Sequence, residues 1–241
     1  MKPRVLLEVC VDDAQGLEAA VAGGADRIEL CSALELGGLT PSPGLVDGAR
    51  SSPVPVFALI RPRLGDFCYG PALIDTMRRD IDAVRDAGLA GVVLGASRSD
   101  FRLDRETLLL LSSQAQGMGR TLHRAFDLVP DFLEALETAI ELGFERILTS
   151  GGAPTAWEGI TVLETLAKAA AGRIRIMPGS GINAGVAAEI VKRTGAGEVH
   201  ASCSVPAGSP GEKIVALGFG SIRSRITDRR TVEGLYRVLQ E

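Results

Sequence analysis

Aromatic residues are scarce in this chain: they make up 4% of its 241 residues, with one tryptophan, and histidine occurs only twice. No apolar run approaches the roughly 18–20 residues that a membrane-spanning helix needs. Charges of both signs are interspersed and sum to −4, so no basic tract favours nucleic acid or an anionic membrane surface. The composition therefore predicts neither a nucleic-acid partner nor a membrane partner.

Cysteine is also sparse, with four residues in the chain. The apolar stretch near the N-terminus meets Glu8 after a few residues, which is too short for a signal peptide. We therefore expect reduced thiols in a cytoplasmic protein. A chain of this length can bury roughly 70–75% of its unfolded surface, so its core needs no disulfide or metal.

Short runs rich in Val, Ile and Leu recur along the chain and predict buried strands. There are eight: Val5–Val11, Arg27–Cys31, Val54–Pro62, Gly91–Gly95, Arg120–Phe126, Arg146–Gly152, Arg173–Gly181 and Glu198–Ser202. Segments with helical spacing of apolar residues alternate with them. These are Asp13–Ala22, Ser42–Arg50, Ala72–Ala87, Asp104–Gln116, Asp131–Gly143, Trp157–Ala171, Gly185–Thr194 and Asp228–Gln240.

Eight strand–helix units predict an α/β fold, a (β/α)8 TIM barrel forming a single domain over residues 1–241. An open doubly wound sheet is the alternative, but the first turn lacks its G-x-G-x-x-G phosphate loop. The one irregular stretch, residues 203–227, is rich in Gly and Pro and suggests a lid or an oligomer contact.

Polar residues gather at the predicted C-terminal strand ends, where such barrels carry their reactive groups. Glu8 and Glu29 alternate with apolar neighbours that suit the helix-facing side, so both carboxylates should point into the barrel. Arg61 and His123 are natural counter-charges on the same rim. We predict acid–base roles for Glu8, Glu29, His123 and Asp127.

Four charged residues stand instead at strand starts, on the face that serves stability. They are Arg27, Arg146, Arg173 and Glu198, and we expect surface ion pairs from them.

An anion site is predicted near strands seven and eight, because the Gly-rich turn Met177–Ile182 offers backbone amides in front of a helix. A tight turn that merely needs glycine is the alternative. The predicted substrate-binding residues are Arg61, Arg63, Thr149, Ser150, Ser180, Gly181 and His200.

The cysteines allow a metal site, because Cys203, Cys10, Cys31 and Cys68 should share one sector of the rim. Cys10 and Cys31 lie on the same side as the glutamates by strand parity. Soft thiolates suit Cu(I) or Zn(II), although cysteine is also common as a small buried residue.

Several phrases of the sequence resemble the CutC family of copper-homeostasis proteins. They include Leu7-Glu8-Val9-Cys10, Gly24-Ala25-Asp26-Arg27-Ile28-Glu29-Leu30-Cys31, Ile60-Arg61-Pro62-Arg63, His123-Arg124-Ala125-Phe126-Asp127 and Glu198-Val199-His200-Ala201-Ser202. The resemblance implies a cytoplasmic TIM barrel that handles copper, with Cys10 and Cys31 as candidate Cu(I) ligands in a homodimer or homotetramer.

Two further functions remain open beside copper handling. The charged groups on the rim favour an enzyme for a small anionic molecule, phosphorylated or carboxylated. A third hypothesis is a structural polar network in a protein that acts through oligomer contacts, with Phe219 and Ile222 in the irregular segment as candidate contacts.

Overall fold

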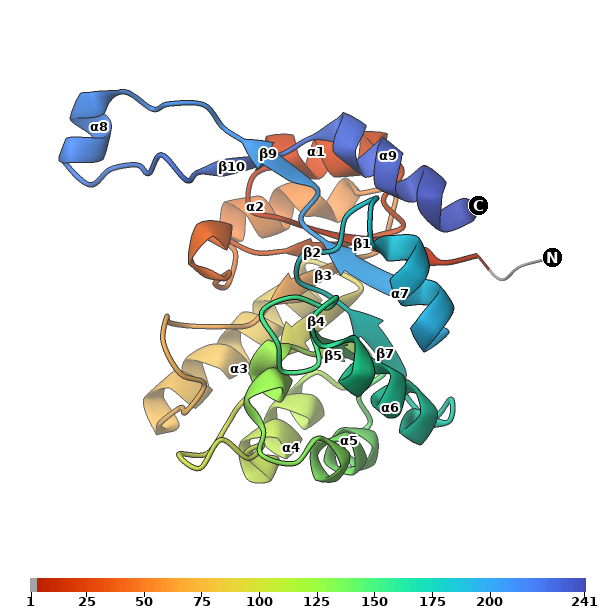
Figure 1. The fold of residues 1–241 in the computed structure, drawn as a ribbon. Coiled ribbons are helices and arrows are strands. Elements are labelled where there is room, and N and C mark those ends of the chain that lie inside the picture. The colour runs from red at the N-terminus through yellow and green to blue at the C-terminus, as the bar shows by residue number, and fades with distance from the viewer. Residues whose placement is uncertain (1–3) are drawn as a thin grey trace.

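The computed structural model describes residues 4–241 and shows a ring of parallel strands surrounded by helices (Figure 1). The eight strands of the ring are β1 Leu6–Val11, β2 Arg27–Leu30, β3 Val56–Leu59, β4 Gly91–Leu94, β5 Gly119–Leu122, β6 Arg146–Thr149, β7 Arg175–Pro178 and β8 Glu198–Ala201. The predicted runs located all of them, and every observed strand is shorter than its predicted run.

The sheet order is β7-β6-β5-β4-β3-β2-β1-β8, and every pair in it is parallel. β1 pairs with both β2 and β8, which brings the last strand back to the first. β7 and β8 are in contact, but no ladder joins them within residues 4–241. The prediction of a (β/α)8 barrel over an open sheet is confirmed, with a seam between β7 and β8.

Helices cover the outer side of the ring, and most begin at a capping residue visible in the sequence. They are α1 Ala14–Ala22, α2 Pro43–Gly48, α3 Pro71–Asp86, α4 Arg105–Gln114, α5 Phe132–Glu141, α6 Ile160–Ala170, α7 Ala187–Thr194 and α9 Arg229–Gln240. Side chains such as Asp13, Ser42 and Asp131 accept hydrogen bonds from the first free backbone N–H groups. Within residues 4–241, no helix has the length and apolarity needed to cross a bilayer.

The chain after β5 differs from the prediction of a strand through Phe126. The strand ends at Leu122, and Arg124–Leu128 forms a 3₁₀ helix instead. His123 caps this helix, since its Nδ1 accepts a hydrogen bond from the Ala125 N–H at 3.1 Å. This local cap fixes the orientation of the imidazole.

The irregular segment forms an arm that projects from the barrel (Figure 1). Its base is an antiparallel pair, β9 Ser204–Pro206 and β10 Arg225–Thr227, and its tip carries the short helix α8 Glu212–Ala216. Phe219 and Ile222 are 82% and 73% exposed on this arm. The sequence did not predict the arm's two strands or its helix.

The main core lies between the strands and the surrounding helices. Leu7, Val9, Ile28 and Leu30 are fully buried there, which confirms the predicted outward side of β1 and β2. The ring interior is different, because charged side chains from several strands fill much of it.

Candidate active site

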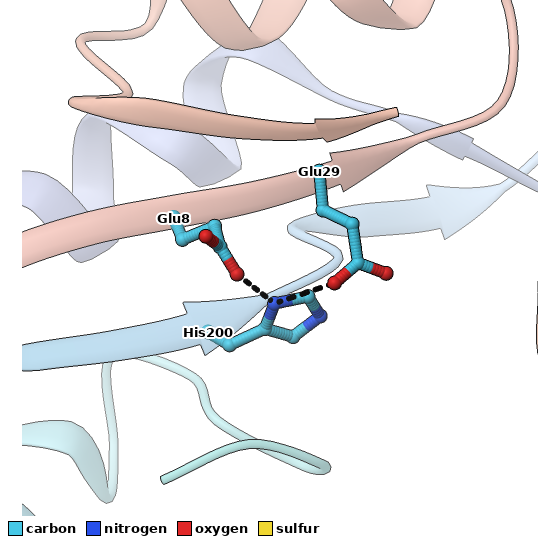
Figure 2. A group of neighbouring side chains, drawn as sticks. All are labelled: Glu8, Glu29 and His200. Atoms are coloured by element: carbon cyan, nitrogen blue, oxygen red, sulfur yellow. Dashed lines mark hydrogen bonds and ion pairs between the residues drawn. The ribbon is translucent and has the colours of Figure 1, made fainter. Parts of the chain in front are cut away.

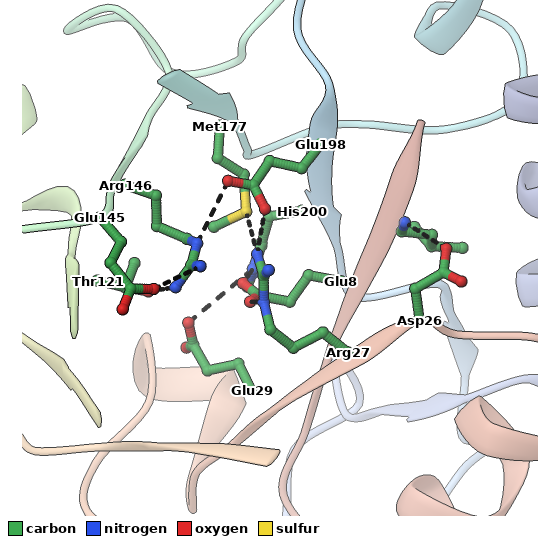
Figure 3. A network of polar contacts seen from close by, with 11 residues as sticks. Glu8, Asp26, Arg27, Glu29, Thr121, Glu145, Arg146, Met177, Glu198 and His200 are labelled. Atoms are coloured by element: carbon green, nitrogen blue, oxygen red, sulfur yellow. Dashed lines mark hydrogen bonds and ion pairs between the residues drawn. The ribbon is translucent and has the colours of Figure 1, made fainter. Parts of the chain in front are cut away.

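An ionic network crosses the barrel interior near the N-terminal ends of the strands (Figure 3). The Arg27 Nε donates to Glu8 Oε2, and its Nη2 lies 2.7 Å from Glu198 Oε2. Register explains the contact, because Glu8 in β1 stands opposite Arg27 in β2, and Glu198 in β8 stands opposite Leu6, two residues before Glu8. All three side chains are at least nine-tenths buried.

A second guanidinium extends this network towards β6. Arg146 Nε lies 3.2 Å from Glu198 Oε1, and its Nη1 donates to Thr121 at 3.1 Å. The Arg27 and Arg146 guanidinium carbons lie 5.4 Å and 4.9 Å from the centre of the Phe57 ring, within cation–π range. Two basic groups are thus held over one aromatic ring.

The prediction of surface ion pairs for Arg27, Arg146 and Glu198 is therefore wrong. Their side chains point inward, and the barrel's own carboxylates and Phe57 compensate their burial. The prediction of a surface ion pair is confirmed for Arg173, whose half-exposed guanidinium pairs with Glu137 at 2.7 Å.

Above the network, Glu8, Glu29 and His200 bring three potential ligand atoms within 4.8 Å of one another (Figure 2). His200 Nδ1 lies 2.8 Å from Glu8 Oε1 and 3.9 Å from Glu29 Oε2. We call these residues the central trio. Among residues 4–241 no other group of three or more His, Cys, Asp or Glu side chains approaches this closely.

The surroundings of the trio shift the pKa values of its two carboxyl groups in opposite directions. Burial alone would raise the pKa of Glu8, but Arg27 and His200 outweigh burial and lower it to about 2. Burial raises the pKa of Glu29 to about 7, against the attraction of His200 and with the repulsion of Glu8. Burial disfavours a charged His200, yet Cys10 and the two carboxylates raise its pKa well above the ordinary value.

A cavity of about 730 Å³ opens at the C-terminal ends of the strands, and His200 lies on its wall. The cavity also contacts Cys10, the turn after β7, and the base of the arm. Its basic lining residues are Arg124, Arg223 and Arg225, and its acidic ones are Asp12, Asp13 and Glu35. We call this space the mouth cavity.

The predicted anion turn lines this cavity. Ser180 and Gly181 both have positive φ, 73° and 71°, and the Ser180 hydroxyl donates to the Pro154 carbonyl at 2.8 Å. Helix α7 begins only at Ala187, so its dipole does not lie directly behind Gly181 as the sequence suggested. The turn offers backbone amides without a helix N-terminus.

The two cysteines predicted as metal ligands lie near each other but in different environments. Cys10 lines the mouth cavity, and its Sγ lies 3.8 Å from the Ala201 carbonyl. Cys31 is fully buried beside Phe57 and Leu59, where its Sγ contacts the Val11 carbonyl at 3.2 Å and burial strongly raises its pKa. Neither thiol belongs to the central trio, and all four cysteines are free.

Arg61 and Arg63, predicted to bind substrate, instead stabilise the loops after β2 and β3. The Arg61 guanidinium donates to the carbonyls of Gly38 at 3.0 Å and Gly65 at 3.1 Å, and Arg63 pairs with Asp66 at 2.5 Å. Neither arginine lines the mouth cavity.

His123 is 5% exposed and lies outside the cavity lining. Its ring packs against Gly95 and the ring of Phe67, with centroids 4.8 Å apart. Burial, and then Arg61, lower its pKa to about 3, and its Nε2 has no hydrogen-bond partner within residues 4–241. The imidazole is therefore neutral at ordinary pH.

Asp127 organises the loop after β6. Its carboxylate accepts hydrogen bonds from Thr149 Oγ1 at 2.5 Å, from the N–H groups of Ser150 and Gly152, and from Arg124 Nε at 2.7 Å. Thr149 and Ser150, predicted to bind substrate, act here as partners of Asp127. Through Arg124 this cluster reaches the mouth cavity.

The model of the CutC family matches residues 5–205, which is most of the chain. The chain belongs to the CutC family. The resemblance seen in the sequence is confirmed.

Relatives and structures agree with this assignment. A CutC family protein of Sinorhizobium medicae (strain WSM419) is 62% identical over 232 residues, covering 96% of this chain and 95% of the relative. One from Caulobacter vibrioides (strain NA1000 / CB15N) is 54% identical over 239 residues, covering 98% of each chain. Both matches are long enough to include most or all of the arm, whereas the family model ends near its base.

A crystal structure from Streptococcus agalactiae, described as a candidate copper homeostasis protein CutC, aligns with a TM-score of 0.79. It is 31% identical and covers 82% of this chain and 98% of its own. A thiamine phosphate pyrophosphorylase from Pyrococcus furiosus aligns at 0.60 with 17% identity, covering 99% of this chain and 96% of its own. That second likeness shows the shared barrel fold alone.

Proposed function

We propose that this CutC family member is an enzyme for a small anionic molecule, phosphorylated or carboxylated, which binds in the mouth cavity. One observation carries the proposal: a single cavity has arginines from two separate segments on its wall and His200 of the central trio beside them. Barrel enzymes bind substrate at this end of the strands.

The arginines supply the recognition of an anion. The Arg223 side chain has no hydrogen-bond or ion-pair partner among residues 4–241, whereas the acidic lining residues are engaged. Asp12, Asp13 and Glu35 accept hydrogen bonds from the Leu34 N–H, the Gly16 N–H and the Ser224 hydroxyl, respectively. An unengaged guanidinium facing a cavity favours carboxylate or phosphate.

The central trio supplies the reactive group. His200 is the member that lines the cavity, and the carboxylates of Glu8 and Glu29 both face its Nδ1 atom. An imidazole oriented by carboxylates is the usual arrangement for proton transfer or for metal-assisted chemistry. In this proposal Glu8 and Glu29 keep their predicted catalytic roles, whereas His123 and Asp127 are positioning residues.

A thermal-shift screen of phosphorylated and carboxylated metabolites tests the proposal. A ligand at 100 times its Kd should stabilise the wild type by about 2.7 kcal/mol. The Arg223→Ala variant should lose this stabilisation, and the Arg79→Ala variant, changed on the exposed face of α3, should keep it. The proposal fails if no compound in a broad panel stabilises the wild type more than Arg223→Ala.

Copper handling is the second candidate, supported by family membership and by the position of Cys10 on the cavity wall. The donor set fits Cu(I) less well, because Cys31 is enclosed and burial strongly raises its pKa. Cu(I) affinity against a competing chelator decides this candidate. Equal, weak affinities for the wild type and the Cys10→Ser/Cys31→Ser double variant would remove it.

The proposal includes a cytoplasmic setting, in line with four free thiols, and a homodimer or homotetramer. The exposed apolar side chains of the arm support self-association, since Phe219 and Ile222 are 82% and 73% exposed to water.

A further inference from the structure

We infer that Glu8, Glu29 and His200 form a binding site for a divalent metal ion such as Zn²⁺, in place of a thiolate site for Cu(I). The inference deepens the proposed function and rests on it, because the central trio adjoins the mouth cavity.

The geometry of the trio is close to that of a metal site. Zn²⁺ binds carboxylate oxygen and imidazole nitrogen at about 2.0–2.2 Å, so ligand atoms around one ion stand roughly 3–4 Å apart. The spacings from His200 Nδ1 are 2.8 Å to Glu8 Oε1 and 3.9 Å to Glu29 Oε2. Figure 2 shows the three side chains converging from neighbouring strands, and their ligand atoms lie within 4.8 Å of one another.

Glu29 is the side chain that most needs a partner. It is 6% exposed, and its Oε2, the oxygen that faces His200, has no hydrogen-bond partner among residues 4–241. A buried carboxylate oxygen without a partner is costly, and a bound cation removes that cost.

The charges of the barrel interior show what a bound ion would replace. The buried carboxylates of Glu8, Glu29 and Glu198 face two buried guanidiniums, those of Arg27 and Arg146, and the His200 imidazole, whose raised pKa favours its charged form. A fourth carboxylate, Glu145, pairs with Arg146 from a half-exposed position and adds no positive charge. A metal ligand must be deprotonated, so a bound ion would take the place of the positive charge on His200 and would contact the unpaired Glu29 oxygen.

Arg27 acts on the trio as an outer-sphere partner of a metal ligand does. It holds Glu8 Oε2 and leaves Oε1 directed at His200. Hydrogen bonds of this kind orient ligating carboxylates. His200 reaches the cavity wall, so a bound ion would keep an open side towards the mouth cavity, as catalytic zinc sites do.

The donor types separate this site from a copper site. Cu(I) selects thiolate and thioether sulfur, whereas two carboxylates and an imidazole suit borderline divalent ions. The inference therefore differs from the copper role named for the streptococcal relative.

Zn²⁺ alone is the probe for the test. Chelator-stripped protein is titrated with Zn²⁺ against a chromophoric competitor, and the bound metal is counted by elemental analysis. We expect one Zn²⁺ per wild-type chain and at least tenfold weaker binding for Glu29→Gln, since even outer-sphere changes cost about 10–100-fold. Cys31→Ser is the matched control and should bind Zn²⁺ as the wild type does.

Three outcomes overturn the inference: no Zn²⁺ binding by the wild type, equal Zn²⁺ affinity in wild type and Glu29→Gln, or a loss of affinity in Cys31→Ser. If Glu29→Gln fails to fold by circular dichroism, His200→Gln takes its place with the same expectation. Arg223→Ala should leave Zn²⁺ affinity unchanged. If the wild type binds no Zn²⁺ but still shows Arg223-dependent stabilisation by an anion, this inference fails and the proposed function stands.

Discussion

Glu8 Oε1 and His200 Nδ1 lie 2.8 Å apart inside the barrel, on strands whose register places the two residues directly opposite each other. The other Glu8 oxygen is held by Arg27, so one carboxylate joins the ionic network below to the mouth cavity above. A substitution near the N-terminal ends of the strands should therefore alter the position of the groups at the reactive, C-terminal end.

Removing Arg27 should strongly destabilise the fold. Arg27→Met leaves Glu8 and Glu198 buried with an uncompensated charge, and breaking a buried ion pair in this way costs about 3–5 kcal/mol. Urea unfolding measures the loss. Arg173→Ala, which breaks an exposed pair, should cost no more than about 1 kcal/mol; equal costs for the two variants would contradict the prediction.

His123 should make the fold sensitive to acid. Its pKa is about 3 in the folded state against an ordinary 6.5, because burial and then Arg61 disfavour the charged ring. The unfolded chain then binds the extra proton first, so the stability that His123 contributes is complete above pH 6.5 and is lost towards pH 3. The loss approaches about 1.4 kcal/mol for each pH unit inside this window.

Urea unfolding at pH 7.5 and pH 5 tests the role of His123. His123→Asn keeps an acceptor for the Ala125 N–H but does not titrate here. The raised pKa values of Glu29 and His200 act in the opposite direction in both proteins, so the stability of the variant is compared with that of the wild type and should rise relative to it between pH 7.5 and pH 5. The same difference in stability at both pH values would contradict the prediction.

Gly119 should be intolerant of a side chain. A Cβ there would lie 2.5 Å from the Phe57 ring, and overpacking of this kind costs about 1–3 kcal/mol. Combining Gly119→Ala with Phe57→Leu should recover part of the loss, because the ring supplies the nearest contacts. Gly234→Ala in α9 meets nothing within 4 Å and should be neutral or slightly stabilising in the same thermal-unfolding assay.

Asp127 should matter for anion binding through Arg124. Asp127→Ala frees Arg124 and leaves the Thr149 and Ser150 donors without their acceptor, at a cost of about 1–3 kcal/mol in unfolding free energy. We expect weaker binding of inorganic phosphate, measured by calorimetry. Unchanged phosphate affinity in a folded Asp127→Ala protein would show that Arg124 needs no such support.

The arm should mediate self-association. Wild type should elute as a dimer or tetramer in size-exclusion chromatography with light scattering, and Phe219→Asp/Ile222→Asp should shift it to monomer. Leu133→Asp, on the exposed face of α5, is the control and should leave the mass unchanged. A monomeric wild type at micromolar concentration would contradict the prediction.

Strand parity explains what could be predicted from the sequence. Leu7 and Val9 are apolar and face the helices, so Glu8 between them had to point inward, and it does. The same two-residue period applies to Arg27, two positions before Glu29, and to Glu198, two before His200. That signal was available, but the position of both residues at strand starts wrongly favoured the surface.

Other parts of the site have no such periodic signal. Arg223 belongs to an irregular segment, and only the path of the arm brings it to the mouth cavity. His123 follows its strand closely, yet the 3₁₀ helix that it caps directs its ring towards Phe67 and Gly95. Loop geometry depends on tertiary contacts that residue spacing does not encode.

The seam between β7 and β8 gives the ring one junction that can widen without the loss of a ladder hydrogen bond. Arg27 and Glu198 border a hollow of about 460 Å³ at this junction, at the end of the barrel opposite the mouth cavity. Brief opening there would admit solvent to the interior charges from below. Amide protons on the facing edges of these two strands should accordingly exchange with deuterium ahead of those between β1 and β2.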